Sequence, residues 1–264
     1  MDLWLDGNHW SIWIRKVCIP EIEWTRHAIL EHMLPSIPDP ATEADKTSNA
    51  IYYEDTEHYS FEEDMCSLAE YAKNQSFEVY DRLSGVRQAA ANIATVMLWH
   101  LLEQQMLVFH TRQVLTVHEE QAARQNPEVK IDIPCKKGKE VKERKLLSLE
   151  KFHSRLDAGG CSMKSLSAWP TVDELRLVAN TVKHGLGPSS DELFKIRPDL
   201  FYPNCDTQEY NSRPCSLRKP AAGEDLYVTE QDIVKYFEAT ISLWQEFSIK
   251  IEEHSQKRDR RHFS

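Results

Sequence analysis

Apolar side chains recur at helical spacing along most of the chain. From Ser60 to about Arg82, and again from Val86 to about Arg124, residues three and four positions apart are apolar, the pattern of helices that bury one face. Between these stretches, Ser84-Gly85 predicts a break. The second stretch would be about 55 Å long at a rise of about 1.5 Å per residue. We therefore expect it to be the spine of a helical bundle or a protruding arm.

The first twenty residues are rich in aromatic side chains, with Trp4, Trp10 and Trp13. The alternating run from Trp10 to Ile14 fits either a strand or part of a helix. After it, Pro20 in a first helical turn and Pro35 as a stop signal predict an amphipathic helix from Glu21 to Leu34.

Pro35 to Asn49 carries closely spaced prolines followed by polar residues, which predicts a loop or linker. We therefore divide the chain into an N-terminal aromatic and acidic segment, residues 1–50, and a helical domain, residues 51–264.

Signals at element ends place the remaining helices. Leu146 to Leu156 is predicted as a helix that Gly159-Gly160 stops, and Val129 to Pro134 as a short extended piece. A Thr-x-x-acid pattern at Thr171 and another at Thr229 predict the starts of two late helices. The fold class that follows is all-α, with roughly five or six major helices packed as a bundle around the long one. We expect the last helix to pack beside the helix that Thr171 opens.

Composition and charge exclude several classes of protein. The net charge is −10, and residues 1–84 alone carry 17 acidic and 6 basic residues, so no overall attraction to nucleic acid is indicated. No apolar run approaches the ~20 residues of a membrane span, and the acidic start of the chain is unlike a secretory signal. The six cysteines lack metal-ligand spacing and are expected to be reduced thiols. These features predict a cytoplasmic protein without a membrane segment.

Local basic residues still leave room for contact with RNA. The run Lys136–Lys145 holds six basic residues in ten positions. Such a run is usually a solvated loop. The alternative is a patch that contacts RNA phosphates through Lys136, Lys137 and Lys139, although no aromatic residue is interleaved for base stacking.

Polar residues within the long helix have a structural interpretation. A hydrogen-bonded or surface position is favoured over a functional one for His100, Glu103, Gln104 and Gln105. Further along, no fixed ligand spacing is formed by His110, His118, Glu119 and Glu120. The chain also lacks a Gly-rich phosphate loop and a Gly-x-Ser-x-Gly turn. We expect neither a metal nor a cofactor.

The helix that Thr171 opens carries a polar stripe. On a helical wheel, about 100° of its surface is occupied by Asp173, Arg176, Asn180, Lys183 and His184. A histidine can take the proton of an RNA 2′-hydroxyl, and fixed positive charge can stabilise the phosphorane. We therefore name as candidate catalytic residues His184, Arg176, Asn180 and Lys183. The alternative is structural, because cationic side chains at a helix C-terminus are favoured by the helix dipole.

The segment Val178-Ala-Asn-Thr-Val-Lys-His-Gly-Leu-Gly187 resembles the HEPN superfamily, in its Asn-x-x-Lys-His-Gly variant. The likeness extends over the late helices, from about Pro170 to Phe247. HEPN proteins are all-helical, and many are RNases of toxin–antitoxin and anti-phage systems. Their motif is an Arg, often followed by a polar residue such as Asn, with a His after four to six residues. Here Ala179 stands where the resemblance places that Arg, and Arg176 lies one turn earlier.

The resemblance implies two functions. The first is a metal-independent endoribonuclease effector of prokaryotic defence that cleaves RNA as a homodimer. In this enzyme, His184 would be the base or acid, Arg176 or Lys183 would stabilise the phosphate, and Asn180 would orient the reacting groups. Arg176 and His184 are about 12 Å apart along one helix, so a second, antiparallel copy would complete the site. The alternative is a non-catalytic interaction module that binds a partner protein or nucleic acid in a defence complex, through the N-terminal tryptophans or the long helix.

Overall fold

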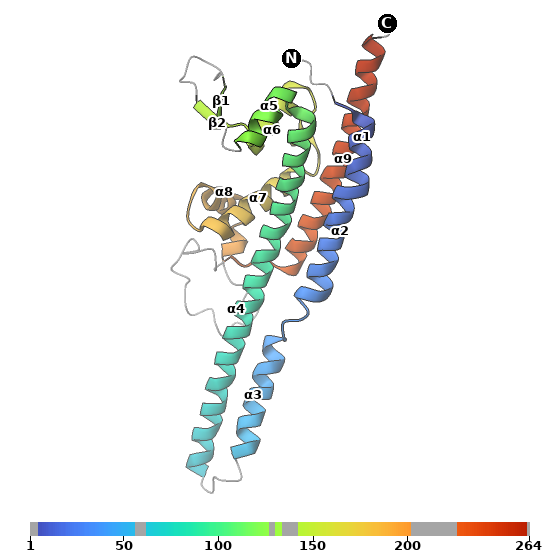
Figure 1. The fold of residues 1–264 in the computed structure, drawn as a ribbon. Helices are drawn as coiled ribbons and strands as arrows, with labels where there is room; N and C mark the ends of the chain where they lie inside the picture. Colours follow the sequence, from blue (N-terminus) through green and yellow to red (C-terminus); the bar gives the residue numbers. More distant parts are fainter. Residues whose placement is uncertain (1–4, 56–61, 127–129, 134–141, 202–225, 263–264) are drawn as a thin grey trace. The chain divides into compact units, whose positions relative to one another are not determined.

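The computed structural model describes residues 5–55, 62–126, 130–133, 142–201 and 226–262 (Figure 1). Within these ranges the protein is helical apart from one pair of antiparallel strands, β1 (Lys130–Ile133) and β2 (Lys142–Lys145). The prediction of an all-α bundle with one long helix is confirmed, as is the extended piece near Val129. The basic run Lys136–Lys145, predicted to be a solvated loop, forms β2 in its last four residues. Lys136, Lys137 and Lys139 lie outside the described residues.

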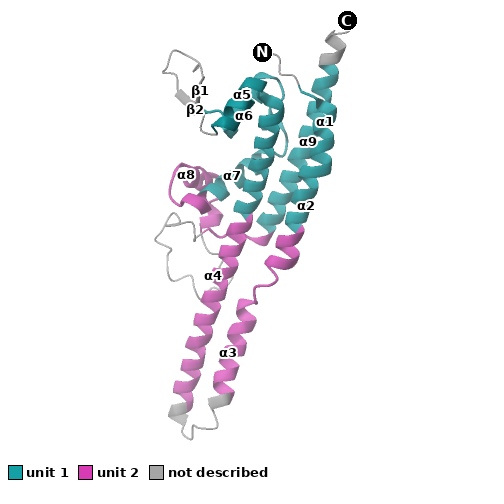
Figure 2. Cartoon of the chain, in the orientation of Figure 1, with its two compact units in different colours: residues 1–26, 95–180, 231–264 teal, residues 27–94, 181–230 magenta. Residues whose placement is uncertain are grey.

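The chain forms two compact units (Figure 2). Unit 1 comprises residues 1–26, 95–180 and 231–264, and unit 2 comprises residues 27–94 and 181–230. The long helix α4 (Glu62–Phe109) contributes many residues to both units, and α7 (Trp169–His184) contributes its last four residues to unit 2 and the others to unit 1. The boundary that we place near residue 50 stays a prediction.

The N-terminal segment is one helical run with two wider π-helical turns. It comprises α1 (Gly7–Trp13), the turn Ile14–Cys18, α2 (Ile19–His27) and the turn Ala28–Met33. The run from Trp10 to Ile14, for which a strand and a helix were both open, is therefore helical.

Each π-helical turn of this run comes just before a proline. The N–H of Ile19, which precedes Pro20, bonds to the carbonyl of Ile14, five residues back. The N–H of Leu34, which precedes Pro35, bonds to the carbonyl of Ile29 in the same way, at 3.0 Å. A proline ring lacks an N–H and clashes with the carbonyl four residues back, and the wider turn accommodates it. Pro20 therefore lies inside the run and opens no helix, so the predicted start at Glu21 is wrong, whereas Pro35 follows the end of the run, as predicted.

The loop predicted from Pro35 to Asn49 is wrong in its second half, where α3 (Pro40–Asp55) begins. Asp39 caps this helix, since its Oδ1 accepts the N–H of Thr42 at 2.9 Å and the Thr42 hydroxyl at 2.8 Å. These hydrogen bonds, above all that from the Thr42 N–H, lower the pKa of the Asp39 carboxyl. Pro40 is tolerated because the first N–H of a helix has no partner within the helix.

The long helix α4 differs from its prediction at both ends. It runs for 48 residues without a break at Ser84-Gly85, because one glycine costs a helix only about 1 kcal/mol. It ends in the π-helical turn His110–Val114, after which Leu115 is extended. A new helix, α5 (Val117–Gln125), then starts at a capping box of Thr116 and Glu119. The predicted helix from Val86 to Arg124 is therefore two helices, separated at the Thr116-x-x-Glu119 capping signal.

The core of unit 1 is built around aromatic rings. Phe109 is completely buried, and its ring centroid lies 4.8 Å from that of Trp10, 5.5 Å from Phe247 and 6.1 Å from Phe152. Trp10 is buried, and Trp13 contacts Trp244. Trp10 therefore belongs to the core, whereas Trp13 is half-buried and Trp4 lies outside the described residues.

Gln105 of α4 is buried in the same core with its amide fully used. Its Nε2 donates to the carbonyl of Cys18 at 3.1 Å and to Glu21 at 2.9 Å, and its Oε1 accepts the indole N–H of Trp244 at 2.7 Å. His100 and Gln104 are exposed. The structural interpretation is confirmed for Gln105, and it stays a prediction for the other polar residues of this group.

Unit 2 packs its own smaller core. Leu193 of α8 (Pro188–Ile196) is buried, as are Leu200 and Phe201 in the short turn Pro198–Phe201. Gln88 of α4 donates to the carbonyl of Val228 at 3.0 Å. The Arg87 guanidinium, also on α4, pairs with Glu230 at 2.6 Å.

Alanine substitutions at two helical glycines are expected to have opposite effects. A Cβ at Gly7 would lie 2.5 Å from the carbonyl oxygen of Ile251 and 2.8 Å from Ser255 Cβ, whereas a Cβ at Gly85 would meet nothing within 4 Å. Gly7→Ala should therefore destabilise unit 1 by about 2 kcal/mol. Gly85→Ala, the matched control, should stabilise α4 by about 0.5 to 1 kcal/mol. Urea denaturation of both variants measures this, and equal effects would contradict the close approach at Gly7.

Candidate functional site

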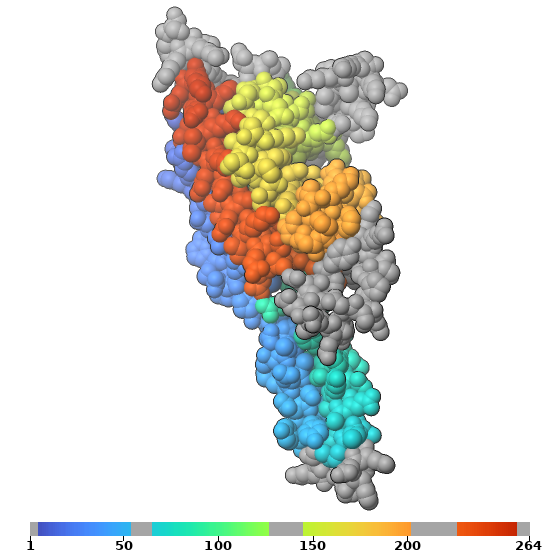
Figure 3. Space-filling model, turned by 180° about the vertical axis from the view of Figure 1, so that it is seen from behind, coloured from blue at the N-terminus to red at the C-terminus, as the bar shows by residue number. Residues whose placement is uncertain are grey.

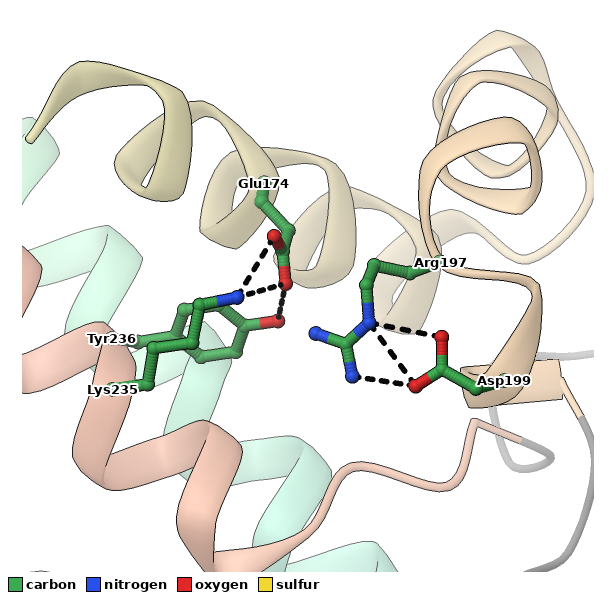
Figure 4. A network of polar contacts seen from close by, with 5 residues as sticks. All are labelled: Glu174, Arg197, Asp199, Lys235 and Tyr236. Atoms are coloured by element: carbon green, nitrogen blue, oxygen red, sulfur yellow. Dashed lines mark hydrogen bonds and ion pairs between the residues drawn. The ribbon is translucent and has the colours of Figure 1, made fainter.

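The candidate residues lie on α7, which contacts α9 (Glu230–His262) through its unit 1 part, residues 169–180; Lys183 and His184 belong to unit 2. Glu174 accepts the Lys235 ammonium at 3.0 and 3.1 Å and the hydroxyl of the buried Tyr236 at 2.8 Å (Figure 4). The second pair in that view, Arg197 and Asp199 at 2.7 Å, belongs to unit 2. α9 begins directly after Thr229, as predicted.

A second set of contacts continues this packing along α9. The backbone N–H of Ser167 donates to Glu246 at 2.7 Å, and Lys250 donates to the carbonyl of Ser162 at 3.0 Å. The space-filling view shows the same neighbourhood, with α9 in red beside yellow residues that precede and include the start of α7 (Figure 3). The predicted packing of the last helix beside α7 is confirmed for these residues.

The start of α7 corrects one detail. The helix begins at Trp169, so Thr171 lies inside its first turn and is not the N-cap. Glu174, predicted to complete a capping box there, instead bonds to α9.

Burial confirms that the polar residues of α7 form an accessible stripe. Lys183 and His184 are exposed, and Asp173, Arg176 and Asn180 are half-buried. The rest of the helix surface is fully covered at Val172, Leu175, Val178, Ala179 and Thr181. Gly185, with φ of 65°, ends the helix, and its N–H bonds to the Thr181 carbonyl at 2.8 Å. This left-handed conformation suits glycine.

Within this stripe, Arg176 is held away from His184. Its Nε donates to Asp173 Oδ1 at 2.6 Å, one turn towards the helix start. His184 lies eight residues in the opposite direction, about 12 Å along the axis. One α7 helix therefore does not bring the two side chains to the same phosphate. Ala179, at the position that the resemblance gives to Arg, has no exposed surface.

Lys183 and His184 occupy the last turn of α7. Positive charge is favoured there because the carbonyl end of a helix is partially negative. This location fits the structural interpretation as well as the catalytic one. The catalytic roles of His184, Lys183, Asn180 and Arg176 stay predictions.

The fold brings a second histidine to the stripe, which the sequence pattern did not reveal. His153 lies on α6 (Leu149–Ala158), and its ring centroid is 4.9 Å from that of Trp169 in an edge-on contact. Trp169, Asp173 and Arg176 are spaced by four and three residues, so they follow one another on one face of α7. His153 thus borders the N-terminal end of the stripe, whereas His184 lies at its C-terminal end.

His153 is neutral at neutral pH. Burial is the largest cause that lowers its pKa to about 4; the charges of Lys164 and Arg176 act in the same direction, and those of Asp157 and Asp173 oppose them. Inside a predicted amphipathic helix, a histidine next to Phe152 carries no signal of its own. Only the tertiary contact with Trp169 shows that His153 lies beside the polar stripe of α7.

A third histidine, His110, is completely buried in unit 1. Neither of its ring nitrogens has a hydrogen-bond partner among the described residues, and its ring lies 5.5 Å from that of Phe152. Burial is the main cause that lowers its pKa to about 4. The charges of Arg155, Lys151 and His153 act in the same direction, and that of Glu119 opposes them.

Arg155 of α6 joins this region to the break after α4. Its guanidinium pairs with Glu119 of the α5 capping box and donates to the Val114 carbonyl at 3.1 Å. The hydrogen bond from Arg155 is the largest cause that lowers the pKa of Glu119 to about 2.

In the described part of the chain, no group of three or more His, Cys, Asp or Glu residues is placed to hold a metal ion. None of the helices in these ranges combines the length and the apolar character needed to cross a membrane.

Comparison with known proteins yields no relative: no protein-family model, no curated protein and no solved structure matches the chain. The resemblance to HEPN proteins therefore stays a prediction from the sequence motif.

Proposed function

We propose that this chain is a non-catalytic, HEPN-like interaction module that binds a partner protein. The observation that carries the proposal is the absence of an arginine beside His184 within α7. Arg176 is paired with Asp173 one turn away from it, and Ala179 is buried. Within α7, only Lys183 is then left beside His184 to supply the fixed positive charge that a phosphorane requires, and a lysine lacks the planar, bidentate donor geometry of an arginine.

Exposed apolar residues on α4 support a protein as the partner. Tyr71, Val86 and Ile93 are each more than half exposed, at 54%, 54% and 52%. They fall within about 60° of one another on a helical wheel, and all three belong to unit 2. The same side of α4 also carries the ion pair of Glu78 and Arg82, between Tyr71 and Val86. Exposed apolar residues interspersed with charged ones on one side of a helix suit association with a protein.

A cleavage assay tests the proposal. The purified protein, incubated with RNA in EDTA, should leave the RNA intact, and His184→Ala should behave like the wild type. Cleavage that leaves 2′,3′-cyclic phosphate ends and is lost in His184→Ala would overturn the proposal. Binding is tested by co-purification from the native host: Ile93→Glu should lose the partner, and the exposed control Asp81→Asn should retain it.

The second candidate is the metal-independent endoribonuclease. One observation favours it, because Lys183 and His184 are adjacent and both exposed. The missing arginine would then come from Arg176 of a second copy, with two α7 helices side by side and antiparallel. This candidate requires a homodimer as the active species, so cleavage should fall with dilution as the dimer dissociates.

A further inference from the structure

Two histidine rings are in contact at the π-helical turn Ala28–Met33. His27 directly precedes this turn and His32 lies within it. Their ring centroids are 5.1 Å apart, and the ring planes meet at 86°. Both residues belong to unit 2 and both are exposed, so an ion dissolved in the solvent can reach the pair.

The π-helical geometry brings the two rings together. In a regular α-helix, residues five positions apart are separated by about 140° around the axis. A π-helical turn is wider and joins residues five positions apart by hydrogen bonds, as the N–H of Leu34 and the carbonyl of Ile29 show here at 3.0 Å. The turn therefore aligns His27 with His32. On an ordinary helix the spacing His-x-x-x-x-His would indicate no site, so the sequence alone did not reveal the pair.

The distance between the rings matches that of two imidazoles bound to one metal ion. A zinc–nitrogen bond is about 2.0 to 2.1 Å long, and two such bonds at a tetrahedral angle place the ring centroids about 5 Å apart. Rotation about χ2, which is broad for histidine, can turn one nitrogen of each exposed ring towards the ion. Imidazole is a preferred ligand of Zn²⁺, Ni²⁺ and Cu²⁺. We propose that His27 and His32 together bind a divalent transition-metal ion such as Zn²⁺.

Two histidines leave part of the coordination sphere open. No third His, Cys, Asp or Glu of the described residues is placed to complete a group of three. The other positions are therefore left to water or to the same pair of a second copy, since four nitrogen ligands suit tetrahedral zinc. Residues 27–34 include Glu31 and no lysine or arginine, so no cationic side chain of this turn repels the ion.

Calorimetric titration of the full-length protein with Zn²⁺, on protein purified without a histidine tag, tests the proposal. His27→Gln and His32→Gln should each weaken binding about tenfold or more, because even a residue that only supports a ligand contributes about 10- to 100-fold to metal affinity. His118→Gln, which removes an exposed histidine of α5, should bind Zn²⁺ like the wild type. One ion per chain would assign the open positions to water, and one ion per two chains would assign them to a second copy.

Urea denaturation gives a second readout, because an ion that binds only the folded chain stabilises it by mass action. Zn²⁺ should raise the unfolding midpoint of the wild type and of His118→Gln more than that of His27→Gln or His32→Gln. Mg²⁺ at the same concentration should not raise it, because Mg²⁺ prefers oxygen ligands. The proposal is overturned if Zn²⁺ does not bind saturably, or if His27→Gln and His32→Gln bind it as tightly as His118→Gln does.

Discussion

Lowering the pH from 7 to 5 is expected to remove about 4 kcal/mol of folding stability, about 2 kcal/mol for each of two buried histidines. His110 and His153 each have a folded pKa of about 4, and a histidine in an unfolded chain titrates near 6.5. A loss of this size is a large part of the ~5 to 15 kcal/mol that holds a domain folded.

The loss of stability at lower pH follows from the difference in proton binding between the folded and the unfolded chain. Between pH 6.5 and 4 the unfolded chain binds protons at both histidines, while the folded chain leaves them neutral. Stability is therefore fully present above pH 6.5 and is lost as the pH falls towards 4. Glu119, with a folded pKa of about 2, acts in a separate and lower window, because its contribution is lost only as the pH falls below about 4.5.

Urea denaturation at a series of pH values, in buffers without phosphate, measures the effect. His110→Leu keeps an apolar side chain of similar size in the core and cannot titrate, so it should remove about half of the pH dependence between pH 7 and 5. The exposed His118 of α5 provides the control, since His118→Gln should leave the dependence unchanged. An unfolding midpoint that stays constant across this range in the wild type would contradict the prediction.

Ala179→Arg, which restores the HEPN pattern in the sequence, is expected to unfold the protein and not to activate it. Ala179 has no exposed surface and is flanked on α7 by the buried Leu175 and Val178. An arginine there would have to displace core side chains or bury an unpaired charge, at a cost of about 4 kcal/mol or more. The expected result is aggregation or a much lower unfolding midpoint, with no RNA cleavage.

Asn180→Arg is the matched control for this substitution. The next residue along α7 is half-buried on the polar stripe, so its arginine can extend into solvent at a cost of about 1 kcal/mol or less. A stable Ala179→Arg protein that cleaves RNA would show that the site is only one residue away from activity, and it would remove the main support for a non-catalytic role.

The elements that sequence reasoning located well are those with local signals. α9 starts after Thr229, α7 ends at Gly185, and α6 ends at Gly159. Each of these ends is set by a capping residue or by the backbone freedom of glycine. The same reasoning failed for Pro20, because a proline favours the first turn of a helix as a local signal, whereas here the π-helical turn before it accommodates the ring inside a continuous run.

The candidate site was predicted only along one helix. Periodicity gave the stripe of α7 and its exposure correctly, since both follow from the spacing of apolar residues. It could not show that Arg176 bonds to Asp173 or that Ala179 is fully covered. Nor could it predict that His153 lies beside the stripe, because the contact of His153 with Trp169 depends on how α6 packs against α7. Neighbours across the core are set by tertiary packing and leave no periodic trace in the chain.

The two π-helical turns have a consequence for how the chain length can vary. Each holds one residue more than a regular helix needs, so the loss of Pro20 would remove the extra residue and the ring together. Ile14 and Ile22, both in the core, would then be seven residues apart and still face the same side. Loss of one residue from the regular helix α4 would instead rotate everything before it by about 100° relative to everything after it. Among descendants of this sequence, single-residue deletions should therefore survive near Pro20 and Pro35 and be eliminated from α4.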